Sequence, residues 1–106
     1  MRIVFDLDGT LCTKTDGDYQ NAQPIVRRIK KVNDLHSAGN EIVIFTARGM
    51  SRNKGNVEKS VADFMGLTRE QLQSWGVKYD ELILGKPAAD FYVDDKGVSD
   101  VDFFKD

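Results

Sequence analysis

The chain has 106 residues, of which 17 are acidic and 15 basic, and its formal net charge is −2. This length holds one modest hydrophobic core, so we expect residues 1–106 to form a single domain. The small acidic excess argues against a dedicated nucleic-acid-binding protein, because such proteins need surplus Lys and Arg to neutralise phosphates. The only cysteine, Cys12, excludes an intramolecular disulfide and a cysteine-rich zinc cluster, and this favours a cytoplasmic location.

No apolar run approaches the roughly 18 residues of a membrane span, and the first residues lack the basic region and long apolar core of a secretion signal. We therefore expect no membrane contact and no targeting segment. Cys12 is interpreted as a small packing residue and not as a nucleophile.

The first element is a short apolar run from Ile3 to Phe5, which predicts a buried strand. Two carboxylates one residue apart, Asp6 and Asp8, end this run, and Gly9 then allows the backbone to turn. Neighbouring carboxylates repel each other, and both stay ionised only when a cation or hydrogen-bond donors compensate them. A magnesium ion bound to Asp6 and Asp8 would compensate their charges. The alternative is that both aspartates are simply solvated at the end of the strand.

The next part of the chain predicts a loop and then a helix. Residues 10–23 are polar, with a turn at residues 16–18, and indicate a loop or a small hairpin. From Pro24 to Ser37, apolar residues recur at spacings of three and four, which is typical of an amphipathic helix. The basic residues of this helix are interpreted as an ordinary exposed face and not as a nucleic-acid surface.

The remaining chain predicts three more strands and further helices. The strands are expected at Glu41–Phe45, Glu81–Leu84 and Phe91–Val93, and the helices at 56–65, at 68–75 and, as a helix or an edge strand, at 98–104. Strands that alternate with helices indicate an α/β protein with a mostly parallel sheet flanked by helices. Ligands of such sheets collect at the carboxyl ends of the strands, which is where Asp6, Thr46 and the Asp94-Asp95 pair follow the apolar runs.

Four stretches of the sequence, taken in order, resemble the four motifs of the haloacid dehalogenase superfamily of aspartate-nucleophile phosphatases. They are Asp6-Leu7-Asp8-Gly9-Thr10, Phe45-Thr46-Ala47-Arg48, Gly85-Lys86-Pro87 and Tyr92-Val93-Asp94-Asp95. The sequences of residues 46–50 and 86–96 are most similar to those of the small phosphatases of capsular polysaccharide biosynthesis. The resemblance covers residues 1 to about 98, and it implies a three-layer Rossmann-like fold.

The resemblance also implies roles for individual residues. Asp6 would be the nucleophile that forms an aspartyl-phosphate, and Asp8 would be the general acid and base. Thr46 would bind the phosphoryl oxygens through its hydroxyl and the backbone N–H groups that follow, so the expected substrate-binding residues include Ala47 and Arg48. Lys86 would hold both the nucleophile and the phosphate with its positive charge.

The implied cofactor is Mg²⁺, and its expected ligands are Asp6, Asp8 through its backbone carbonyl, Asp94 and Asp95. Asp95 is favoured over Asp94 as the direct ligand. Lys86 lies only eight residues before Asp94 with no helix between them, which departs from the commonest pattern of the family. Lys96 is therefore the alternative for the phosphate-binding lysine.

Members of the superfamily usually carry an inserted cap domain, and this chain is too short to hold one. The resemblance therefore implies an open site, which either admits bulky substrates or is covered by a neighbouring subunit of a homo-oligomer. Arg48 and Arg52 are candidates for contacting the substrate beyond its phosphate, with exposed arginines as the alternative.

The function that these observations favour is that of a magnesium-dependent phosphomonoesterase. Its expected substrate is a sugar phosphate or a related metabolite of surface-polysaccharide synthesis. One alternative is a phosphatase that acts on nucleotides or polynucleotide ends, for which steep salt dependence is expected. The other is a non-catalytic phosphate-binding scaffold domain, which would bind without turnover.

Overall fold

Three apolar runs of the sequence form a parallel sheet in the computed structural model, which describes all residues from 1 to 106. The strands are β1 (Arg2–Phe5), β2 (Glu41–Thr46) and β3 (Glu81–Leu84), in the spatial order β1-β2-β3. Phe5 lies opposite Ile44, and Thr46 lies opposite Leu84. The carboxyl ends of all three strands therefore meet at one edge, as expected for an α/β protein with a parallel sheet.

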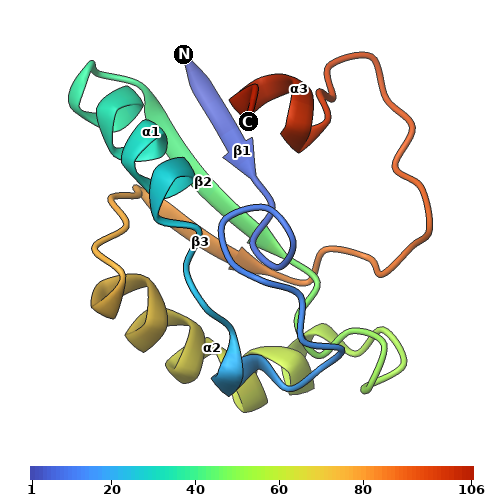
Figure 1. The fold of residues 1–106 in the computed structure, drawn as a ribbon. Helices are drawn as coiled ribbons and strands as arrows, with labels where there is room; N and C mark the ends of the chain where they lie inside the picture. Colours follow the sequence, from blue (N-terminus) through green and yellow to red (C-terminus); the bar gives the residue numbers. More distant parts are fainter.

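One 3-10 turn and three α-helices alternate with and follow the strands. They are η1 (Tyr19–Asn21, a 3-10 turn), α1 (Val26–Ser37), α2 (Val57–Ser74) and α3 (Asp100–Phe104). Figure 1 shows α1 beside β2, α2 below the sheet and α3 beside β1. None of these helices combines the length and the apolar character that crossing a lipid bilayer requires.

The hydrophobic core lies on one face of the sheet. Ile42 and Ile44 of β2 are fully buried there and belong to the same cluster as Ile29 of α1, Leu72 of α2 and Phe104 of α3. The opposite face carries a different set of apolar side chains, and none of them belongs to the core cluster: Val4, Val43, Phe45 and Ile83. The cluster that the helices complete thus lies on one side of the sheet, and on the other side Val43 is buried as well.

The fourth strand expected at Phe91–Val93 does not form, and this prediction was wrong. Residues 86–99 make an irregular excursion between β3 and α3 (Figure 1, orange to red). Phe91 is 84% exposed and Val93 is 95% exposed. The physical reason is the short connection, because only the six residues Gly85–Asp90 separate β3 from Phe91, whereas a crossover to a parallel strand takes about a dozen.

Two other expectations also need correction. The helices expected at 56–65 and 68–75 are one continuous helix, α2. Thr68 does not cap a helix start, because its hydroxyl accepts a hydrogen bond from Arg48 inside the protein. The loop or small hairpin expected at residues 10–23 is confirmed: the segment contains η1, and its ends pair antiparallel at the Cys12–Pro24 bridge. The segment expected at 98–104 contains the helix α3, which the Ser99 side chain caps.

The C-terminal helix is fastened to α1 by one buried arginine, Arg28. Its Nε and Nη2 donate to the carboxylate of Asp106 at 2.7 and 2.8 Å, and its Nη1 donates to Asp100 at 2.7 Å. The same Nη1 donates to the Thr10 carbonyl at 3.1 Å, so Arg28 also holds the loop after β1. Hydrogen bonds from Arg28 lower the pKa of Asp106 from 3.8 to about 2, and they lower the pKa of Asp100 as well.

Because both pKa values are lower in the folded chain, the two carboxylates stabilise the fold above pH 4 and lose this effect as the pH falls towards 2. Asp106→Asn should therefore lower the urea midpoint of unfolding at pH 7, and the difference from the parent chain should shrink as the pH approaches 2. Asp34→Asn is the control, since the Lys30–Asp34 pair is exposed and such pairs contribute little. A decrease in the urea midpoint that is as large near pH 2 as at pH 7 would contradict this explanation.

Candidate active site

The loop after β1 is built around a buried leucine. Leu7 is fully buried, and its carbonyl accepts hydrogen bonds from the N–H groups of Thr10, Leu11 and Cys12 at 3.0, 2.8 and 3.3 Å. Because side chains alternate along an extended chain, burying Leu7 turns its two neighbours, Asp6 and Asp8, away from that part of the core. The tight turn that follows needs Gly9, whose φ is +85°.

Asp6 lies at the open side of this edge with a cation and a hydroxyl beside it. Lys86 Nζ is 3.5 Å from Asp6 Oδ1, and Thr10 Oγ1 donates to Asp6 Oδ2 at 3.3 Å. The Asp6 side chain keeps 35% of its surface exposed, and that of Lys86 keeps 19%. Lys86 is positioned from the end of the neighbouring strand, because its N–H donates to the Thr46 carbonyl at 3.2 Å. A partly exposed carboxylate is thus held against an ammonium group at the carboxyl edge of the sheet.

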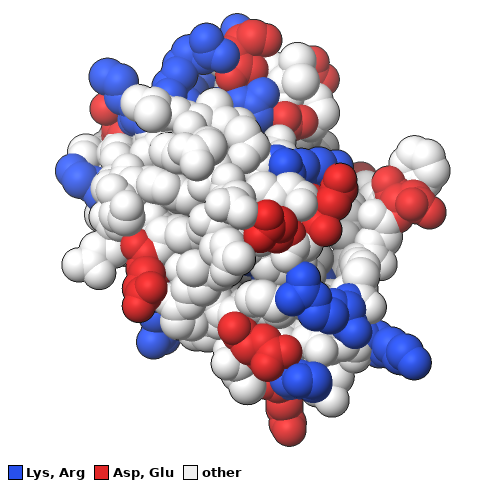
Figure 2. All heavy atoms as spheres, turned by 60° about the horizontal axis from the view of Figure 1, so that its bottom comes forward, with Lys and Arg blue, Asp and Glu red and all other residues white.

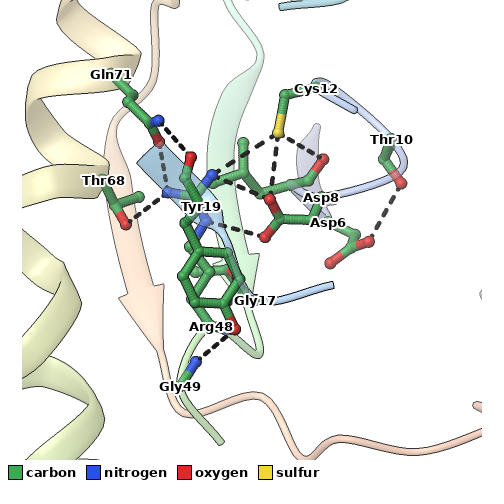
Figure 3. A network of polar contacts seen from close by, with 12 residues as sticks. Asp6, Asp8, Thr10, Cys12, Gly17, Tyr19, Arg48, Gly49, Thr68 and Gln71 are labelled. Carbon is green, nitrogen blue, oxygen red and sulfur yellow. Dashed lines mark hydrogen bonds and ion pairs between the residues drawn. The ribbon is translucent and has the colours of Figure 1, made fainter. Parts of the chain in front are cut away.

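Asp8 is held in a different way, by a buried arginine. Arg48 Nε donates to Asp8 Oδ2 at 2.9 Å and Arg48 Nη2 donates to Asp8 Oδ1 at 3.0 Å, which makes a two-pronged ion pair (Figure 3). The Arg48 side chain has no exposed surface, and that of Asp8 keeps 20%. Such a fork fixes the plane of the carboxylate as well as its position.

The other N–H groups of Arg48 all have protein partners. Nη1 donates to Gln71 Oε1 at 2.5 Å and to Thr68 Oγ1 at 3.2 Å, and Nη2 also contacts Cys12 Sγ at 3.8 Å. The ring of Tyr19 lies 4.9 Å from the guanidinium carbon (Figure 3). Arg48 therefore has no donor left for a substrate, and the expectation that it contacts one directly was wrong. The reason is that Asp8 and α2 enclose it.

Cys12 contacts the buried side of the ion pair between Arg48 and Asp8. Its thiol is buried and donates to Asp8 Oδ1 at 3.4 Å. Burial, reinforced by the nearby charge of Asp8, raises the pKa of Cys12 to about 12. The thiol stays protonated at neutral pH, as expected for a packing residue and not for a nucleophile.

Thr46 and the residues after it form the middle of the edge. Thr46 is buried, and its Oγ1 accepts from the Arg48 N–H at 3.2 Å, so the hydroxyl proton remains free to donate. The chain then turns through Ala47 and Gly49, which has a φ of +81°. A side chain at Gly49 would place its Cβ 2.6 Å from the Phe64 ring. This turn therefore requires glycine, and it brings residues 46–48 beside Asp8.

The structure does not bring Asp94 and Asp95 to this edge. Both are exposed and belong to the irregular segment at 86–99. Asp94 Oδ1 instead accepts from the N–H groups of Lys96 and Gly97. No group of three or more His, Cys, Asp or Glu side chains in the chain is arranged to hold a metal ion. Arg48 engages the Asp8 carboxylate, whereas the Asp8 backbone carbonyl, the ligand that the resemblance implies, is not part of this ion pair. Magnesium as the cofactor stays a prediction.

Two hollows lie on the surface, and neither is lined by Asp6 or Asp8. One, of about 550 Å³, lies between the loop after β2 and the residues on either side of Lys86; it is lined by Met50, Ser51, Lys54, Gly55, Val57, Gly85, Pro87 and Ala88. The other, of about 410 Å³, includes Arg52 together with Tyr19 and Phe64. Arg52 is exposed, as the alternative for this residue anticipated, and its Nη2 donates to the Gly17 carbonyl at 2.7 Å.

Three residues that sequence reasoning missed support the site from behind: Tyr19, Thr68 and Gln71. Thr68 and Gln71 are both buried, and they interrupt the apolar stripe of α2 that Phe64 and Leu72 define. Buried polar side chains need partners. Thr68 and Gln71 lie three residues apart on the apolar side of a helix. This pattern could have indicated from the sequence that a polar group packs against the helix.

Replacing Arg48 with methionine should destabilise the chain strongly. The substitution leaves Asp8, Thr68 and Gln71 without their donor, and breaking one side of a buried ion pair costs about 3 kcal/mol or more. Urea unfolding followed by far-ultraviolet circular dichroism would measure this loss. Arg52→Met is the matched control and should cost less than about 1 kcal/mol, because Arg52 is exposed. Equal losses for the two variants would show that the Arg48 pair does not carry the stability assigned to it.

Comparison with known proteins relates this arrangement to one solved structure. Neither the protein-family models nor the curated proteins gave a match. The crystal structure of a structural-genomics target from Vibrio cholerae superposes with a TM-score of 0.90 at 38% sequence identity, over 97% of this chain and 86% of that one. The name of that protein states no activity. At this identity and coverage, the chain belongs to the same family as the Vibrio cholerae protein.

Proposed function

We propose that this chain is a phosphomonoesterase of the haloacid dehalogenase type, which transfers the phosphoryl group to Asp6 and then to water. The observation that carries this proposal is the setting of Asp6. Its carboxylate is partly exposed at the carboxyl edge of a parallel sheet, with Lys86 Nζ at 3.5 Å and the Thr10 hydroxyl at 3.3 Å. The four motifs that resemble this superfamily support the same assignment, and so does the α/β fold with its parallel sheet.

The protein residues divide the chemistry between them. In the first step an oxygen of Asp6 forms a bond to phosphorus and the bond to the ester oxygen breaks, so the product is an aspartyl-phosphate and an alcohol. Asp8 gives the proton that the departing oxygen needs, and it takes a proton from the water that later attacks phosphorus. Lys86 offsets the negative charge on Asp6 and on the phosphoryl oxygens.

Two features of the site qualify the role of Asp8 and of magnesium. Because both oxygens of Asp8 accept from Arg48, a proton on Asp8 removes the negative charge that this ion pair depends on. Magnesium dependence is part of the proposal through the resemblance. The steps above are assigned to protein residues alone.

A small phosphorylated metabolite is the substrate that we propose, and a sugar phosphate fits best. The hollow of about 550 Å³ adjoins Lys86 through Gly85 and Pro87, and Ser51 and Lys54 line it. These hydroxyl and ammonium groups suit a hydroxyl-rich substrate. The similarity to phosphatases of capsular polysaccharide biosynthesis points in the same direction, and it implies a cytoplasmic enzyme.

The phosphatase that acts on polynucleotide ends has less support. Such an enzyme needs a continuous basic track for the nucleic-acid backbone. Figure 2 shows Lys and Arg interspersed with Asp and Glu around a broad area that carries neither. A non-catalytic phosphate-binding domain would lack turnover altogether, so the assay below separates it from the enzyme.

Assays against a panel of phosphorylated sugars, nucleotides and an aryl phosphate, with and without magnesium, test the proposal. Asp6→Asn should reduce turnover by more than about a thousandfold, because it removes the nucleophile. Lys86→Met should reduce it about a hundredfold through the lost positive charge. Lys30→Met is the matched control and should retain activity, since the Lys30 side chain is 77% exposed on α1. Activity that survives in Asp6→Asn would refute the proposal.

A further inference from the structure

We propose that two copies of the chain exchange an arm, defined as residues 87–98. In this arrangement Phe91–Val93 of one copy lies along the unpaired edge of β1 in the other, and the Asp94-Asp95 pair that follows comes to the carboxyl end of that strand. The exchange itself rests on the fold. Its consequence for catalysis, a site shared between copies, rests on the proposed function.

The arm carries apolar side chains that have no place in the core of their own chain. Phe91, Tyr92 and Val93 are 84%, 51% and 95% exposed, and Val98 is 65% exposed. Three consecutive exposed residues with aromatic or β-branched side chains are unusual on a soluble monomer and typical of a strand. The contacts of Tyr92 are local, because its hydroxyl donates to the Pro87 carbonyl and its ring lies 4.3 Å from Lys86 Nζ at the base of the arm.

The sheet offers a matching surface. β1 pairs only with β2, so the hydrogen-bonding groups along its other edge have no strand partner, and α3 beside it contacts β1 through the Phe103 ring, 5.5 Å from that of Phe5. Val4 of β1 is 51% exposed, and together with Phe45 and Ile83 it lies on the face that is outside the core cluster. Parallel sheets are normally covered on both faces, and open strand edges readily accept an added strand.

The arm cannot reach this edge in its own chain as a parallel strand. It leaves the sheet from the carboxyl end of β3, which lies on the far side of β2 from β1. A parallel strand beside β1 would have to begin at the opposite end of the sheet, beyond two strands. The six residues Gly85–Asp90 are about half the length that even a crossover between neighbouring strands takes. A second copy removes this restriction, and a two-fold axis satisfies both arms at once.

The exchange also bears on the positions of the acids that the resemblance assigns to the metal. With Val93 placed beside Phe5, the next two residues of the arm, Asp94 and Asp95, follow at the same edge as Asp6. One chain alone assembles no group of three acids. A pair of chains would then form two equivalent sites, each built from the Asp6 of one copy and the arm of the other.

The mass in solution tests the exchange without reference to activity. Light scattering after gel filtration should give twice the chain mass of 11.9 kDa. Val93→Asp should give the single-chain mass, because it places a charge in the exchanged strand. Val26→Asp should leave the double mass, since Val26 is 72% exposed on α1, away from the arm. A single-chain mass for the parent protein, or a double mass for Val93→Asp, would overturn the exchange.

A cross-link identifies the contact, and mixed variants test the shared site. Under oxidising conditions Val4→Cys/Tyr92→Cys should give covalent dimers; a disulfide within one chain would overturn the exchange.

Refolding Asp6→Asn together with Asp94→Asn/Asp95→Asn should restore about a quarter of the parent activity, because half of the random pairs are mixed and each has one intact site. A cross-linked dimer with no activity in any form contradicts the proposed function and leaves the exchange; an active monomer contradicts only the exchange.

Discussion

The ion pair between Arg48 and Asp8 is the interaction on which the rest of this edge depends. A guanidinium with no exposed surface must satisfy all its donors inside the protein, and here they reach the loop after β1, the thiol of Cys12 and two side chains of α2. The pair therefore joins the ends of β1 and β2 to the long helix in one network. Asp8 is fixed by this network, whereas Asp6, two residues earlier, stays partly exposed and faces Lys86.

A second buried arginine acts on the same loop from the other side. Arg28 donates to the Thr10 carbonyl while it holds Asp100 and Asp106 of the C-terminal segment. The loop from Asp6 to Cys12 is thus tied to α1 by Arg28 and to α2 by Arg48. This is the kind of support that a reacting carboxylate needs, since misplacement by about 1 Å weakens catalysis severely. The contacts of Arg28 with Asp100 and Asp106 thus also help to position the loop at the carboxyl edge of the sheet.

Local patterns in the sequence predicted most of the fold. The apolar runs that end at Phe5, Phe45 and Leu84 and the helical spacing after Pro24 are all confirmed, because each reflects burial against neighbours close in the chain. Phe91–Val93 has the composition of a strand, yet its pairing depends on the length of the connection before it, which composition does not show. Arg48 was expected to contact the substrate, with an exposed arginine as the alternative, and its burial was missed because its partners on α2 lie 20 and 23 residues away. Asp6 and Lys86, by contrast, were placed together by the resemblance, and the structure puts them 3.5 Å apart.

The central claim is that the exposed carboxylate of Asp6 accepts the phosphoryl group, and trapping that intermediate tests it most directly. An acyl phosphate is reduced by borohydride to an alcohol, so quenching the protein during turnover of a phosphomonoester and reducing it should convert Asp6 to homoserine. Peptide mass spectrometry would locate the change. The account predicts homoserine at position 6 and nowhere else. Turnover that leaves Asp6 unmodified, or that modifies another residue in its place, would contradict it.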